Sequence, residues 1–175
     1  MKSSIRDNVY SIGCEPILKT LVVYYSRTGN AKFMAETIAA ELGSDLEEVI
    51  DLRNRQGKLA FLPAGRDAMR GRETEIAQTK RSPAECDLIV IGQPVWAGSP
   101  TPAIRTYLSK NDLSGKKVAL FFSDSSDQAV EKTKALMPRS IFVSELSLPA
   151  KTFNNKEENK KKIVEWCSTL KTETH

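Results

Sequence analysis

A chain of 175 residues with 40% hydrophobic and 27% charged residues has the size and composition of one soluble globular domain. It contains no apolar run of the roughly 18 residues that span a bilayer, and its start lacks the apolar block of a signal peptide, so we expect a cytoplasmic protein. Its three cysteines are far apart and its one histidine is the last residue, which argues against a disulfide framework, a metal site and a histidine-dependent triad. The net charge of +4 is modest and the basic residues are not interleaved with aromatic ones, so we do not expect nucleic-acid binding.

The chain is predicted to begin with an N-terminal extension, residues 1–18, followed by a single domain, residues 19–171. Residues 22–25 are a run of β-favouring residues without alternation, which is typical of a strand buried on both faces of a parallel sheet. After a polar break, apolar residues recur at helical spacing up to Leu42, and Gly43 marks the end of that helix. The first unit is therefore a strand, a polar loop and a helix.

The polar loop between them, residues 26–31, has the chemistry of a phosphate site. The start of a helix presents free backbone N–H groups and the positive end of the helix dipole, and the side chains here add hydroxyls and a glycine that lets a ligand approach the backbone. The alternative is that Ser26 or Asn30 only caps the helix. The loop lacks both nucleotide-binding glycine fingerprints, which argues against ATP and classical dinucleotides. The candidate binding residues are Ser26, Arg27, Thr28, Gly29, Asn30 and Ala31.

A second strand is predicted at residues 46–52, and its order after a strand and a helix implies a right-handed parallel crossover. The chain from 53 to 83 is less regular, with a possible helix at 64–69. Five arginines lie between Arg53 and Arg72, and they form either an anion-attracting flap or a solvent-facing excursion.

A third strand, residues 87–91, runs into a loop that prolines and glycines keep from being helical. Trp96 lies in the middle of this loop, with no periodicity that would place it in a core. A large aromatic side chain at the end of a parallel strand can stack on a planar ligand, in which case its removal should spare the fold. The alternative is that Trp96 folds back onto the sheet. The candidate ring-binding residues are Pro94, Val95, Trp96, Ala97 and Gly98.

The rest of the chain continues the alternation. We predict a helix at 102–108, a strand at 116–122, a helix at 128–137, a strand at 140–148 and an amphipathic helix at 155–170. The loop after the fourth strand contributes Ser123, Asp124 and Ser125 as further candidates, although Asp124 and Asp127 could instead cap the following helix. The predicted fold is α/β, a three-layer doubly wound five-stranded parallel sheet of order 2-1-3-4-5, with all three loops at one crevice.

The 26–30 and 94–99 loops, in this order on these strands, resemble the phosphate loop and the isoalloxazine loop of the flavodoxin-like family. The resemblance covers about residues 19–170 and implies that FMN is the cofactor, held by the candidate residues given above. The chain departs from the family in three ways. Ala31 replaces a common second threonine, the 123–127 loop has no glycine, and the pI near 8.9 differs from the acidic surfaces of many electron-carrier flavodoxins.

The resemblance implies an FMN-binding redox protein that transfers electrons through a non-covalently bound flavin to or from a redox partner protein. One alternative is an FMN-dependent NAD(P)H oxidoreductase acting on quinones. Another is a flavodoxin-fold interaction module without bound flavin, since fold alone does not establish function. A homodimer is compatible with either. No catalytic side chain is assigned, because the flavin supplies the chemistry in this family.

Overall fold

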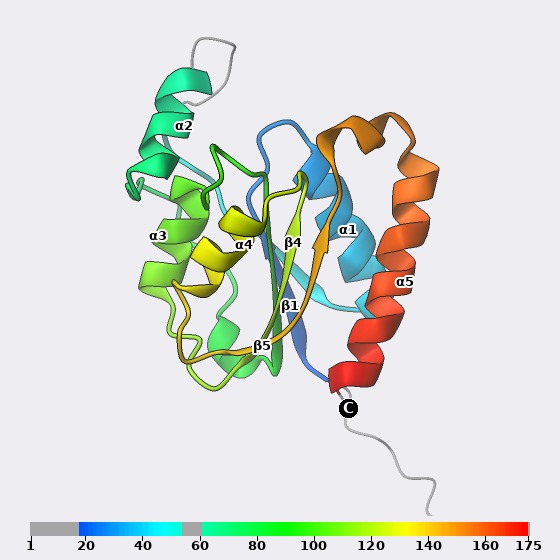
Figure 1. Ribbon diagram of the computed structural model, residues 1–175. Coiled ribbons are helices and arrows are strands. Elements are labelled where there is room, and N and C mark those ends of the chain that lie inside the picture. The colour runs from blue at the N-terminus through cyan, green and yellow to red at the C-terminus, as the bar shows by residue number, and fades with distance from the viewer. Residues whose placement is uncertain (1–17, 54–60, 175) are drawn as a thin grey trace, which may run out of the picture.

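The structure, a computed structural model, describes residues 18–53 and 61–174. One parallel sheet of order β2-β1-β3-β4-β5 lies between two helical layers, as predicted (Figure 1). The strands are β1 Thr20–Tyr24, β2 Asp45–Glu48, β3 Leu88–Gln93, β4 Lys117–Phe122 and β5 Ile141–Ser147. The helices are α1 Asn30–Leu42, α2 Phe61–Met69, α3 Pro102–Lys110, α4 Asp127–Lys134 and α5 Lys156–Thr174, with short 3-10 segments at Pro83–Glu85 and Ala150–Asn154. The predicted extension lies almost entirely outside the described residues.

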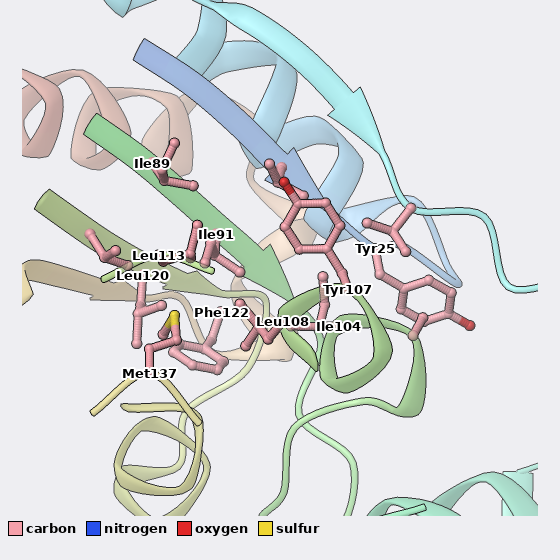
Figure 2. Close-up of a cluster of buried hydrophobic side chains, with 14 of the residues drawn as sticks. Tyr25, Ile89, Ile91, Ile104, Tyr107, Leu108, Leu113, Leu120, Phe122 and Met137 are labelled. Carbon is pink, nitrogen blue, oxygen red and sulfur yellow. The ribbon is translucent and has the colours of Figure 1, made fainter. Parts of the chain in front are cut away.

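The three central strands are buried on both faces, because α1 and α5 cover one side of the sheet and α3 and α4 cover the other (Figure 1). Alternate residues of β1 point to opposite sides: Val23 packs toward α3, and Val22 packs toward α1. Figure 2 shows the α3 side, where Ile91 and Phe122 of the strands meet Ile104 of α3. This double burial explains why the strands read as continuous apolar runs.

The second strand is shorter than predicted. β2 ends at Glu48, and only the N–H of Val49 still donates to β1, at Tyr24 O. The chain then turns away and pairs in the antiparallel direction with residues 75–77, through Leu52 N–H to Glu75 O at 2.9 Å and the return bond to Ile50 O. The side chains of Ile50 and Leu52 are more than half exposed. Their apolar character led to an incorrect strand end.

The fourth helix also differs from the prediction. It spans Asp127–Lys134 rather than residues 128–137, and the next residues tighten into turns in which Met137 N–H donates to Lys134 O. Pro138 disfavours helical geometry in the residue before it, so the last turn unwinds. Met137 nonetheless stays in the core beneath β4 (Figure 2).

Gly92 extends β3 beyond its predicted end and lies directly beside the ring of Phe121 on β4. The two residues are partners in the parallel register, and a Cβ atom at Gly92 would overlap that ring. Phe121 is fully buried. Glycine is therefore required here by close packing, and not by an unusual backbone angle.

The two described cysteines, Cys86 and Cys167, are buried free thiols. Burial raises the pKa of Cys167 to about 12, so the thiol is protonated at neutral pH. Cys14 lies outside the described residues. Within the same described part of the chain, no helix is long and apolar enough to cross a membrane.

Candidate functional site

Three loops leave the carboxyl ends of β1, β3 and β4, which are neighbours in the sheet. β1 pairs with β3, and β3 pairs with β4, both in parallel, so the loops emerge at one edge (Figure 1). The winding reverses between β1 and β3, where doubly wound sheets bind their ligands. The candidate residues that the sequence assigns to the three loops are therefore brought to one end of the molecule.

The 26–31 loop ends in a helix start with no side-chain cap. Gly29 is the N-cap residue of α1, with φ of 93°, and within the described part of the chain no side chain accepts a hydrogen bond from the first turn of the helix. Ser26 Oγ instead accepts from Gly29 N–H at 3.1 Å. Both capping alternatives, through Ser26 or through Asn30, are therefore wrong. The first turn of α1 contains no acidic residue, so its N–H groups and positive dipole end face no carboxylate of their own helix.

The six candidates of this loop differ in exposure. Thr28 and Gly29 are exposed, and Ser26, Arg27 and Asn30 are half-buried. The methyl group of Ala31 is buried in the core on the α1 side of the sheet. Only the backbone of Ala31 is thus placed to face a ligand.

Trp96 is a core residue. Its side chain is 6% exposed and belongs to the cluster on the α3 side of the sheet. It packs edge-to-face against Tyr25 at the end of β1, with ring centroids 5.6 Å apart, and the Arg27 guanidinium lies 6.0 Å from its centroid. This is the folded-back alternative, and it indicates that the fold depends on the indole. The contact of Trp96 with a flavin ring stays a prediction.

A tight turn follows Trp96. The N–H of Ser99 donates to Trp96 O at 3.0 Å, and the two central residues both have positive φ, 49° at Ala97 and 61° at Gly98. Positive φ at both positions is the pattern of a type I′ turn, for which glycine and asparagine are preferred. Among the described residues, Ala97 is the one non-glycine residue with positive φ. It presents an exposed methyl group at the tip of the loop.

The base of the 94–99 loop is held by Gln93, a residue that the sequence reading missed. Its side chain is fully buried, with Oε1 accepting from Thr101 N–H at 2.8 Å and Thr101 Oγ1 at 3.0 Å, while Nε2 donates to Thr133 Oγ1 at 3.1 Å. Its carbonyl accepts from Ser123 N–H in the neighbouring loop. The sequence does contain a signal for this role, because a glutamine at the end of an otherwise apolar strand is expected to be buried and a buried amide needs hydrogen-bond partners.

The 123–127 loop is tied to the chain after β5. Asp124 Oδ1 accepts from Ser125 N–H at 2.8 Å and from Ala150 N–H at 3.5 Å. The helix cap is Ser126, whose Oγ accepts from Ala129 N–H, so neither Asp124 nor Asp127 has the capping role that the alternative assigned. Ser123 is buried, Asp124 half-buried and Ser125 exposed.

The arginine-rich excursion borders the 94–99 loop. A Cβ atom built on Gly65 of α2 would lie 3.9 Å from Ala97 Cβ. Asp67, which is 3% exposed, pairs with Arg53 at 3.0 Å and with Arg72 at 3.3 Å. Two of the five arginines are thus bound to a buried carboxylate, two others (Arg66 and Arg70) are exposed, and Arg55 lies outside the described residues. Anion attraction by this flap stays a prediction.

Comparison with known proteins gives three informative structural relatives. A flavoprotein from Lactobacillus acidophilus, solved in complex with FMN, is 27% identical over 80% of this chain and 99% of its own, with a TM-score of 0.66. The apo-form of a flavoprotein from the same organism is 26% identical over 79% and 97%, with a TM-score of 0.57. Oxidised flavodoxin 2 from Bacillus cereus, 20% identical over 85% and 94% with a TM-score of 0.53, shares the fold.

The family of the chain is shown by a match to a protein-family model that covers most of its length. The model of the flavodoxin family matches residues 19–170, which include all five strands and the three loops at the edge of the sheet. The strand order and the position of the loops agree with that match. The chain belongs to the flavodoxin family.

Proposed function

We propose that the protein binds FMN non-covalently and transfers electrons through it. The observation that carries this proposal is the uncapped start of α1, where the 26–31 loop gathers hydroxyls, an amide and a guanidinium around free N–H groups with no carboxylate in the first helical turn. The relative from Lactobacillus acidophilus was solved in complex with FMN, and an apo-form is also known from that organism. This pair of structures supports a flavin that can be removed.

The donor set fits a phosphate dianion. Hydroxyls and N–H groups can each donate to phosphate oxygens, and such charge-assisted hydrogen bonds are about twice as strong as neutral ones. Arg27 adds a positive charge in the same loop. Gly29 is exposed and in the left-handed region, and apart from its chain neighbours no described residue has an atom within 4 Å of where a Cβ would lie, so a ligand could approach the backbone from that side.

The two other loops would hold the ring. The exposed Ala97 and the half-buried Pro94, Val95 and Gly98 offer apolar surface, and Asp124 offers a carboxylate held by hydrogen bonds in the neighbouring loop. The bound flavin would supply the acceptance and release of electrons. The protein's contribution is to bind the phosphate, to orient the ring between the loops, and to set the local charge that the ring experiences.

The proposal is tested by comparing FMN with riboflavin. Fluorescence titration of the apo-protein should show FMN binding far more tightly, because riboflavin lacks the phosphate that the 26–31 loop is built to receive. Thr28→Val should weaken FMN binding by about 1 to 3 kcal/mol through loss of one charge-assisted hydrogen bond, and should leave riboflavin binding unchanged.

The matched control is Thr169→Val on α5, a threonine that donates to Glu165 O far from the site and should not alter either affinity. Equal affinities of the wild-type protein for FMN and riboflavin would show that the phosphate assignment is wrong. A purified protein that is colourless and takes up no added FMN would leave the interaction module as its function.

Asp124 should make the flavin harder to reduce. Reduced FMN carries negative charge on the pyrimidine side of its ring, and a carboxylate about 5 Å away at an effective dielectric near 20 would oppose it by roughly 3 kcal/mol. This corresponds to a shift of about 0.1 V as an upper limit, because solvent screens a half-buried group. Asp124→Asn keeps the oxygen that accepts from Ser125 and Ala150, so it should raise the midpoint potential without releasing the loop.

The measurement is a redox titration at low ionic strength, with Asp127→Asn as the comparison. Asp127 is exposed at the first position of α4, so its replacement should have a smaller effect. If neither substitution moves a midpoint potential, both carboxylates lie outside the reach of the flavin.

A further inference from the structure

Helix α4 contacts the turn at 96–99 through two side chains, those of Gln128 and Lys132, which are one helical turn apart. A Cβ atom at Gly98 would overlap Oε1 of Gln128, so the two residues are in direct contact. Four residues later, Lys132 Nζ donates to Ser99 Oγ at 3.0 Å. Residues separated by four lie on the same face of a helix, so one face of α4 packs against the turn.

Lys132 and Lys134 lie on the same helix and differ in whether a carboxylate pairs with the ammonium group. Lys134 pairs with two carboxylates, Glu131 at 3.0 Å and Glu145 at 3.2 Å. Lys132 is half-buried, and among the residues that the structure describes no carboxylate lies within 4.0 Å of its ammonium group. Partial burial of a cation without a counter-ion is unfavourable.

A positive charge at this place has a simple electrostatic consequence. Ser99, to which Lys132 donates, is 1% exposed and closes the turn whose tip, Ala97, is exposed. The ammonium therefore lies against the base of this turn, in one of the three loops proposed to hold the flavin. An opposite charge near a group favours its charged form, and the effect is larger where solvent is displaced.

We propose that Lys132 is a positioning residue that fixes the 96–99 turn and favours the reduced, anionic form of the flavin. The inference rests on the proposed function, and it concerns a residue outside the three loops. Lys132 would act against Asp124: the carboxylate disfavours electron uptake, and the ammonium promotes it. The balance between these two groups sets the potential of the site.

The test compares Lys132→Met with Lys134→Met, which removes the same charge from the same helix. The affinities for oxidised and reduced FMN are measured, together with the midpoint potential. In Lys132→Met the preference for the reduced form should fall by about three- to tenfold, tenfold being about 59 mV for a one-electron step. Lys134→Met should change this preference less than twofold, and the difference between the variants should shrink as salt is added. Lys132→Arg, which keeps the charge, should restore most of the preference.

A second readout uses the flavin-free protein. Lys132→Met should speed amide hydrogen exchange at Ser99, whose N–H closes the turn, whereas Lys134→Met should not. Equal preferences in the two methionine variants would overturn the electrostatic role, and unchanged exchange would overturn the positioning role. If the wild-type protein takes up no FMN, the proposed function and the electrostatic role are both overturned, and the exchange rate at Ser99 alone decides the positioning role. FMN uptake with equal preferences overturns the electrostatic role alone.

Discussion

Replacement of Gly92 by alanine is expected to lower the free energy of unfolding by about 3 kcal/mol, at the upper end of the cost of overpacking a core. The added methyl group would overlap the ring of Phe121, which is fully buried in the neighbouring strand. Neither strand can shift easily, because β3 and β4 lie in the interior of the sheet. Urea unfolding followed by circular dichroism measures the loss.

Gly65→Ala is the matched control for this substitution. Its added Cβ would make only an ordinary contact of 3.9 Å with Ala97, and alanine is the better helix former, so stability should stay the same or rise by up to about 1 kcal/mol. A double-mutant cycle identifies the cause. In a Phe121→Leu background, Gly92→Ala should cost at least about 1 kcal/mol less. Equal losses in the two backgrounds would show that the ring of Phe121 is not responsible.

Trp96→Ala should be nearly as destabilising, at about 3 to 5 kcal/mol. The substitution removes a side chain that is only 6% exposed and leaves a cavity beside Tyr25. Trp96→Phe keeps a ring for the edge-to-face contact and should cost less than half as much. Thermal and urea unfolding of the flavin-free protein measure this effect without any contribution from a ligand.

The ligand contribution of Trp96 is measured separately. In Trp96→Phe, FMN affinity and the quenching of flavin fluorescence report whether the indole reaches the ring. If Trp96→Ala unfolds at the same urea concentration as the wild-type protein, the burial described for Trp96 does not hold in solution.

The strand order and the location of the site could be predicted from the sequence, because both depend on local patterns. The apolar runs at 22–25 and 87–91 mark buried parallel strands, and the glycines and hydroxyls after them mark loops at the same sheet edge. Gly43 ended the first helix as expected, in the left-handed region with φ of 59°.

The errors came from contacts between residues far apart in the chain. Ile50 and Leu52 look like strand residues, yet they leave β1 because residues 75–77 offer a second partner. Trp96 lacks any periodicity of its own, and its burial depends on Tyr25, which the fold brings beside it. The partners of Gln93, Thr101 at the N-cap of α3 and Thr133 in α4, are likewise brought together only once the sheet has formed.

The antiparallel bridge between residues 50–52 and 75–77 has an evolutionary consequence. It holds the two ends of the excursion side by side, so the chain between them can change in length and composition while the sheet keeps its register. That stretch contains α2, whose Gly65 lies beside Ala97. If the protein transfers electrons as proposed, new preferences for donors or acceptors could arise by exchanging this one surface segment, with the three loops at the sheet edge left unaltered.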